Sequence, residues 1–94
     1  MSEKFYPVTG CSIFLPEKTV RVESKLFPRK DTADGYRWAQ KMSVGRSIIE
    51  FFNIVNAEIR KLEAVGGLRA ERRVSGIKTF KIALVEAVTG MKVE

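Results

Sequence analysis

Four basic residues stand where a β-hairpin would bring them face to face, and they carry the clearest chemical signal in this chain. The segments Lys18–Phe27 and Gly35–Val44 both alternate apolar and polar residues, as half-buried strands do. The pairing that keeps the apolar side chains on one face sets Arg21 against Lys41 and Lys25 against Arg37. Like charges directly opposite each other destabilise a sheet by up to ~1 kcal/mol per pair. The stripe therefore indicates a seat for a polyanion, most commonly nucleic acid; the alternative is two solvated strands that happen to be basic.

Aromatic side chains in the same two segments could stack on nucleic-acid bases. Tyr36 and Trp38 share the apolar face of the second segment, so they either stack bases or pack in the core. Phe27 is the better stacking candidate, because its neighbours on the cationic face are Lys25 and Arg29. Stacking on an aromatic side chain is worth about 1–3 kcal/mol per base and tolerates any base.

Two further groups of cations extend this predicted surface. The turn-rich stretch Pro28–Gly35 is expected to form an exposed hairpin loop, with Arg29 and Lys30 near its tip. A second basic patch follows later in the chain and could bind the same polyanion; the alternative is a solvated loop. The predicted nucleic-acid-binding residues are Arg21, Lys25, Phe27, Arg29, Lys30, Tyr36, Arg37, Trp38, Lys41, Arg69, Arg72 and Arg73.

Composition limits the class of protein. The 94 residues suit one domain spanning residues 1–94, and 17 Lys and Arg against 11 Asp and Glu give a formal net charge of +6, which favours an acidic partner. Histidine is absent, so a His general base and His-ligated zinc are excluded. The single cysteine, Cys11, cannot form an internal disulfide and is expected to be a small buried hydrophobe. We therefore expect no enzyme activity, no catalytic residues, no metal and no cofactor.

The same composition indicates where the chain works. It has no apolar run of 18 residues and no signal-peptide pattern at its start, which predicts a cytoplasmic protein without membrane contact. Amides are few (Gln40, Asn53 and Asn56) and 30% of the residues are charged. This usage resembles that of hyperthermophile proteins and suggests an archaeal, thermophilic source.

One long helix is predicted from Ser47 to the stop at Gly66–Gly67. Ser47 and Glu50 have the spacing of a capping box, and apolar residues then recur at helical intervals. The apolar arc is wider than one core face requires. Either the last third of the chain covers the excess or a second subunit does; we expect a homodimer whose interface includes Phe51, Ile54 and Val65.

Strands are predicted on both sides of this helix. Cys11–Leu15 indicates a short edge strand, Ser75–Gly76 a hairpin turn, and Ile77–Val88 a strand, although its Ala-Leu-Val-Glu-Ala portion keeps a helix open. The predicted fold is α+β, an antiparallel sheet of about five strands packed on one long helix in the order β-β-β-α-β-β.

The order of parts resembles two families of small single-strand DNA-binding proteins. A basic, aromatic-bearing hairpin (Lys18–Val44), then Gly45, then a long helix (Arg46–Val65) looks like the positive cofactor four coactivators and the archaeal ThermoDBP group. The resemblance covers about residues 4–65. The ThermoDBP likeness implies a hydrophobic cleft rimmed by Lys and Arg, with counterparts here at Phe27, Tyr36, Trp38, Arg21, Lys25, Arg37 and Lys41.

These observations predict sequence-tolerant binding of single-stranded nucleic acid, DNA ahead of RNA, by a homodimer. One alternative is binding of double-stranded DNA or RNA, because charge alone does not report shape. The other is a dimeric scaffold or protein-interaction subunit, in which the wide helix face is the working surface.

Overall fold

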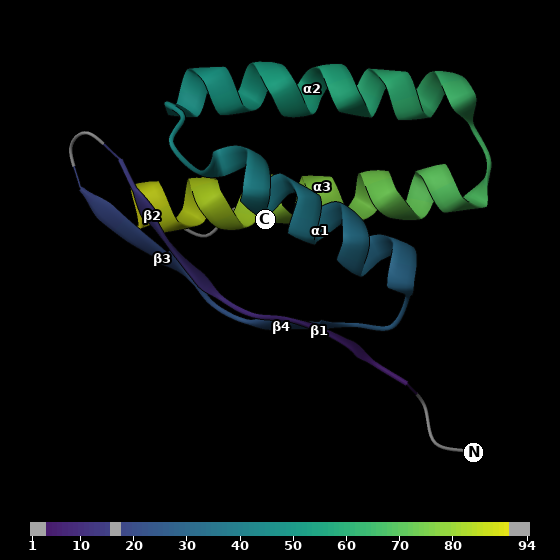
Figure 1. Cartoon of the computed structure of the whole chain (residues 1–94), viewed down its shortest axis with the longest axis horizontal. Helices are drawn as coiled ribbons and strands as arrows, with labels where there is room; N and C mark the ends of the chain where they lie inside the picture. Colours follow the sequence, from purple (N-terminus) through teal and green to yellow (C-terminus); the bar gives the residue numbers. More distant parts are fainter. Residues whose placement is uncertain (1–3, 16–17, 91–94) are drawn as a thin grey trace.

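In the part of the chain that the structure describes, a two-stranded β-ribbon is followed by three helices. The computed structural model describes residues 4–15 and 18–90, and Figure 1 shows the ribbon running along one side of the helices. The elements are β1 (Tyr6–Val8), β2 (Cys11–Phe14), β3 (Thr19–Val22), β4 (Lys25–Phe27), α1 (Lys30–Ser43), α2 (Ile48–Val65) and α3 (Leu68–Thr89). The predicted α+β class is confirmed. The five-stranded sheet on one helix is wrong, because the described residues form two antiparallel ladders of two strands each and three helices.

The ribbon is one long antiparallel hairpin, and the face that is buried against the helices changes at its middle. β2 pairs with β3 and β1 with β4 in a single continuous register, so Ile13 faces Val20 and Tyr6 faces Phe27. The predicted strand at Cys11–Leu15 is thus confirmed as β2. In the β2–β3 ladder, here called the tip half of the ribbon, Val20 is buried. In the β1–β4 ladder, the other half, Phe27 is buried and Leu26 is 67% exposed.

A break between the ladders, at Thr9–Gly10 opposite Glu23–Ser24, is where the buried face changes side. Only glycine fits at Gly10, because a Cβ there would lie 2.5 Å from the Val22 carbonyl oxygen.

Helix α1 occupies the residues predicted to form a hairpin loop and its second strand. Those two predictions, for Pro28–Gly35 and Gly35–Val44, are wrong. The buried face of α1 is made of small residues with one large aromatic: Ala33, Gly35, Tyr36, Ala39 and Ser43. Because most of that face is Gly, Ala and Ser, the spacing of the large apolar residues does not reveal the helical period of α1.

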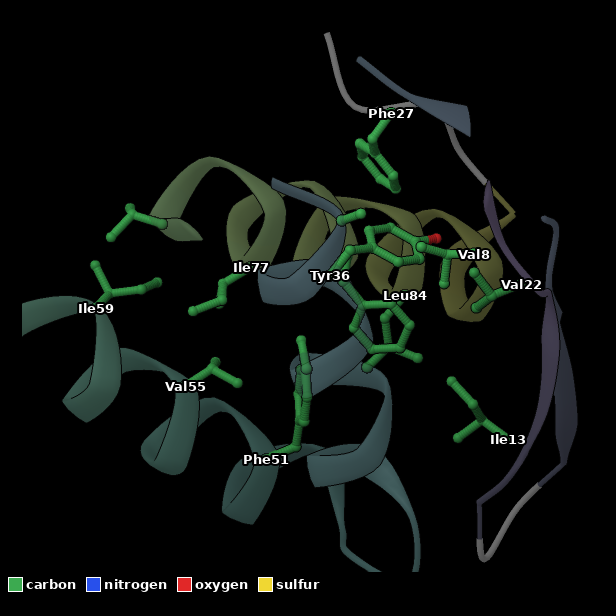
Figure 2. Packing of buried hydrophobic residues seen from close by; sticks show 14 of the residues in the cluster. Val8, Ile13, Val22, Phe27, Tyr36, Phe51, Val55, Ile59, Ile77 and Leu84 are labelled. Carbon is green, nitrogen blue, oxygen red and sulfur yellow. The ribbon is translucent and has the colours of Figure 1, made fainter. Parts of the chain in front are cut away.

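Helix α2 forms as predicted. Ser47 is its N-cap and accepts a hydrogen bond from the Glu50 N–H at 3.2 Å. Gly66 ends it with φ +74°, a conformation that side chains rarely adopt. Phe51, Val55 and Ile59 form its buried face, turned toward the other helices (Figure 2).

Helix α3 replaces the predicted second hairpin. The turn at Ser75–Gly76 and the strand at Ile77–Val88 are wrong, because both lie within one continuous helix. Its largest buried side chains, Val74, Ile77, Phe80 and Leu84, recur every three or four residues, as a single buried stripe requires. This helix covers part of the wide apolar face of α2, including Phe51.

The backbones of α1 and α3 meet directly where the two helices cross. A Cβ on Gly35 would lie 2.1 Å from the Arg73 carbonyl oxygen, and one on Gly76 would lie 1.9 Å from that of Thr32. Real Cβ atoms do not approach so closely, so both positions require glycine for packing and not for a turn.

Rings of four elements join in the core beside this crossing. Tyr36 is fully buried, with its ring centroid 5.0 Å from that of Phe27 and 5.2 Å from that of Phe80. Phe51 of α2 packs edge-on against Phe80 at 5.7 Å. Ribbon, α1, α2 and α3 thus share one hydrophobic core (Figure 2). Among the described residues no helix is long and apolar enough to cross a bilayer.

Candidate nucleic-acid interface

The basic stripe predicted for a hairpin is not formed. Arg21 of β3 faces Ser12, and Lys25 of β4 faces Val8. Lys41 and Arg37 lie on α1 instead, so none of the predicted like-charge pairs exists. Arg21 and Lys25 are nevertheless both exposed, and the only ion pair of Arg21 within the described residues is a solvent-exposed contact with Glu23 at 3.8 Å.

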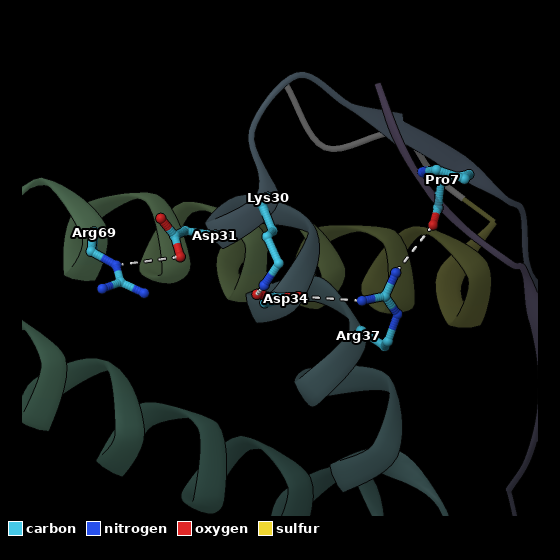
Figure 3. A network of polar contacts seen from close by, with 6 residues as sticks. All are labelled: Pro7, Lys30, Asp31, Asp34, Arg37 and Arg69. Carbon is cyan, nitrogen blue, oxygen red and sulfur yellow. Dashed lines mark hydrogen bonds and ion pairs between the residues drawn. The ribbon is translucent and has the colours of Figure 1, made fainter. Parts of the chain in front are cut away.

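Some of the predicted phosphate-binding cations have structural partners. Arg37 donates to the Pro7 carbonyl oxygen at 3.1 Å and pairs with Asp34 at 3.3 Å, so it fastens α1 to the ribbon. Lys30 pairs with the same carboxylate at 3.0 Å (Figure 3). Lys41 is exposed on α1 and has no ion pair in the described part of the chain. Arg37 and Lys30 are therefore less available to a ligand than Lys41.

The second basic patch lies beside the first turn of α1. Arg69 pairs with Asp31 at 3.7 Å, which places the beginnings of α1 and α3 together (Figure 3). Arg72 and Arg73 follow Arg69 at helical spacing on the same face and are half-buried. The structure thus brings Arg69 to Asp31 in the first turn of α1, one residue from Lys30 in sequence.

Two of the three predicted stacking aromatics are buried. Phe27 is 6% exposed and Tyr36 fully buried, while Trp38 is half-buried against the core. Phe27 does share its strand face with Lys25, as predicted, but that face is turned toward the core at Phe27, so the ring is not available for stacking. The exposed aromatic rings are Phe14, 77% exposed on β2, and Phe5. Sequence reasoning missed Phe14, although the alternation of buried Ile13 with its neighbours places Phe14 on the outer face.

The predicted dimer residues have different environments. Phe51 is buried by α3, Ile54 is half-buried, and Val65 is 75% exposed at the end of α2. Burial of Phe51 by α3 is the within-chain alternative that the sequence left open. A homodimer stays a prediction and rests on Ile54 and Val65 alone.

A hollow of about 520 Å³ lies between the ribbon and the C-terminal half of α3. Arg21 and Lys25 border it from the ribbon, and Tyr36 of α1 also lines it. The Tyr36 hydroxyl is buried and has no hydrogen-bond partner within the described residues. Burial raises the pKa of Tyr36 to about 12, with a smaller contribution from Cys11, so the phenol stays protonated at neutral pH. Nothing in the sequence pattern indicated this site.

Cys11 packs at the edge of the core without reactive surroundings. It is half-buried, and the Gln40 side-chain amide donates to its Sγ at 3.7 Å. Burial raises the pKa of this thiol, which outweighs the opposite effect of the Gln40 hydrogen bond. Within residues 4–15 and 18–90, no three His, Cys, Asp or Glu side chains converge as a metal site would require.

Comparison with protein-family models, with curated proteins and with solved structures finds no match for this chain. The basic hairpin Lys18–Val44, on which the resemblance to positive cofactor four and ThermoDBP rests, is not formed, because α1 occupies its second half.

Proposed function

We propose that this protein binds nucleic acid through the sugar–phosphate backbone and holds a duplex at least as tightly as a single strand. One observation carries the proposal: the predicted stacking rings Phe27 and Tyr36 are buried, while cations such as Arg21, Lys25 and Lys41 are exposed. A surface that offers charge without that pair of rings favours contacts with phosphates over stacking on bases. The net charge of +6 supports the same partner.

The shape of the ribbon supports a duplex. The major groove of B-DNA admits a two-stranded β-ribbon, and ribbons are one established means of groove binding. The ribbon here presents Arg21 and Phe14 on the exposed face of its tip half, and Lys25 is exposed in the other half. The ribbon is also fixed to the helices, since Lys18 donates to the Val88 carbonyl oxygen at 2.6 Å and Gln40 to that of Thr9 at 3.0 Å.

Fluorescence anisotropy with a 20-base-pair duplex and a 20-nucleotide oligo(dT), at several salt concentrations, tests the proposal. We expect duplex binding in the range of about 1–100 μM that is typical of non-specific complexes. Arg21→Ala with Lys25→Ala should flatten the slope of log K against log salt by up to ~1.8, at about 0.9 per phosphate contact. Arg60→Ala with Lys61→Ala, a matched pair on an exposed part of α2, should leave the slope unchanged.

Two outcomes would contradict the proposal. Absence of binding to either probe at low salt would remove nucleic acid as the partner. Tighter binding of oligo(dT) than of duplex, with quenching of Trp38 fluorescence, would restore the single-strand interpretation. It would then require Trp38 to become more accessible on binding.

One observation favours the rival function of a protein-interaction subunit. Phe14 and Val44, 77% and 73% exposed, both border an apolar groove of about 410 Å³ between β2 and the end of α1. Exposed apolar surface beside a groove is typical of protein contacts. If this function holds, the wild-type protein should show no salt-dependent duplex binding.

A further inference from the structure

The hollow between the ribbon and α3 has the size and walls of a ligand site. Its volume of about 520 Å³ lies within the roughly 300–1,000 Å³ of small-molecule pockets. Val22 of the ribbon and Ile82, Ala83 and Ala87 of α3 form apolar walls. Two walls of this kind facing each other suit a flat, largely apolar group.

One residue that lines the hollow, Tyr36, carries a polar group without a partner in the described part of the chain. The Tyr36 hydroxyl has no partner within the described residues, although the side chain is fully buried. Its oxygen is directed toward Val8 and Val22 of the ribbon (Figure 2). Buried hydroxyls in folded proteins are nearly always hydrogen-bonded, so one without a partner calls for an explanation. As a protonated phenol it would donate to an acceptor, such as a carbonyl oxygen.

Charged side chains of both signs border the hollow. Arg21 and Lys25 border it from the ribbon, together with Glu23, which pairs with Arg21, while Glu86 borders it from α3. A single anionic group next to Arg21 and Lys25 would be favoured, whereas a longer polyphosphate would also meet the carboxylates.

We propose that this hollow binds one mononucleotide unit. Its base lies between the ribbon and α3 with a carbonyl oxygen accepting from Tyr36, and its single phosphate lies against Arg21 and Lys25. The unit is either a free nucleoside monophosphate or an unpaired nucleotide of a bound strand. The second source rests on the proposed function, because it requires the protein to hold nucleic acid. To reach the phenol, the base must part the side chains that cover it, so binding requires a local opening between ribbon and α3.

Titration of the ¹⁵N-labelled protein with thymidine 5′-monophosphate tests the site directly. We expect the amide signals of Thr79, Ala83 and Ala87, which lie on the hollow's α3 wall, to shift with a Kd below about 1 mM. Thymidine, which lacks the phosphate, and inorganic phosphate, which lacks the base, should each bind at least about tenfold more weakly. Thymidine triphosphate should bind no more tightly than the monophosphate.

Paired variants separate the two contacts. Tyr36→Phe keeps the ring and removes only the hydroxyl, so it should weaken thymidine monophosphate binding about tenfold, the loss expected for one hydrogen bond. Its matched control is Tyr6→Phe on β1, which does not border the hollow. Lys25→Ala should weaken the monophosphate but not thymidine, and Lys61→Ala should change neither.

A blunt duplex and the same duplex with a one-thymidine overhang distinguish the sources. Preferential binding of the overhang, lost in Tyr36→Phe, assigns the unit to a strand. Equal binding of both duplexes, with the monophosphate still bound, assigns it to a free nucleotide. Absence of shifts at the hollow up to about 10 mM monophosphate overturns the inference even if the duplex binds. Binding of the monophosphate without duplex binding overturns only the proposed function. An unchanged affinity of Tyr36→Phe for the monophosphate would show that the Tyr36 hydroxyl does not contact the base and would overturn that part of the inference.

Discussion

At the α1–α3 crossing two backbones touch through Gly35 and Gly76, whereas the β-ribbon touches the helices through one row of side chains and leaves the other row in solvent. The crossing has no room for an added methyl group at either glycine. Most outward-facing positions of the ribbon have nothing above them. The two regions are parts of one core, but they should respond very differently to substitution.

The crossing determines how the helices are arranged, whereas the ribbon supplies exposed surface. The crossing fixes how α1 and α3 lie and thereby positions Tyr36 below the hollow. The ribbon contributes the other wall of that hollow and the exposed Arg21 and Lys25. A change at the crossing should therefore affect folding first, and a change on the outer ribbon should affect binding first.

Gly76→Leu should give the largest effect. Its Cβ would overlap the Thr32 carbonyl oxygen, so α1 and α3 would have to separate. We expect a loss above about 5 kcal/mol, comparable with the whole stability of a small domain. Circular dichroism and urea unfolding would report it. Ser75→Leu, the exposed neighbour, is the control and should stay folded; a stable Gly76→Leu would show that the helices do not cross at this point.

Phe27→Ala and Phe14→Ala compare the two faces of the ribbon. Phe27 is buried against Tyr36, so its truncation should cost about 3–5 kcal/mol of unfolding free energy. Phe14 is 77% exposed, and its truncation should stay within about 0.5 kcal/mol of wild type. Chemical denaturation of both variants measures the difference. Equal losses would mean that the ribbon does not turn over at Gly10.

Alkaline pH should weaken the fold through Tyr36. Burial raises its pKa to about 12 from 10.0, so the folded state holds the proton more tightly than the unfolded chain. This contribution is complete below pH 10 and is lost as the pH rises from 10 toward 12, amounting to about 1.4 kcal/mol at pH 11. Urea unfolding at pH 8, 10 and 11 should show a steeper decline for wild type than for Tyr36→Phe. Parallel declines would place the Tyr36 hydroxyl in contact with solvent.

Arg69→Ala should have the smallest effect. The ion pair with Asp31 joins an Arg69 side chain that is 89% exposed to a partly exposed Asp31 side chain, and such pairs contribute about 0–1 kcal/mol. Arg69 also lies in the first turn of α3, where the helix dipole disfavours a cation. The two terms oppose each other, so thermal unfolding should change by less than about 0.5 kcal/mol. A loss well above 1 kcal/mol would indicate that this ion pair orients α1 on α3.

Helix α2 could be predicted from the sequence, because its signals are local and agree with one another. Ser47 caps it, Gly66 stops it, and large apolar residues mark its buried face. Helices α1 and α3 could not be predicted, because small residues make up part of their buried faces and give no clear helical pattern of large apolar residues. Gly35 and Gly76 look like turn signals in the sequence, yet each is a glycine that lets another backbone approach.

The surface cations could be predicted from composition, but their partners could not. Arg37 and Arg69 contact residues that only the folded chain brings near. The alternation of β3 and β4 would place Phe27 among the cations, and a ribbon that changes face at Gly10 places it in the core. The hollow depends on the approach of elements more than forty residues apart, which no local pattern reports.

The position of α3 in the chain has a consequence for how the protein is made. Helix α3 supplies Ile77, Phe80 and Leu84, which belong to the core that the ribbon and α2 share. It is synthesised after every other described element. A nascent chain that ends before α3 would leave Tyr36 and Phe51 exposed to water. Assembly of the core must therefore wait until α3 has left the ribosome. During that interval the partly made chain would be prone to aggregation or a substrate for chaperones.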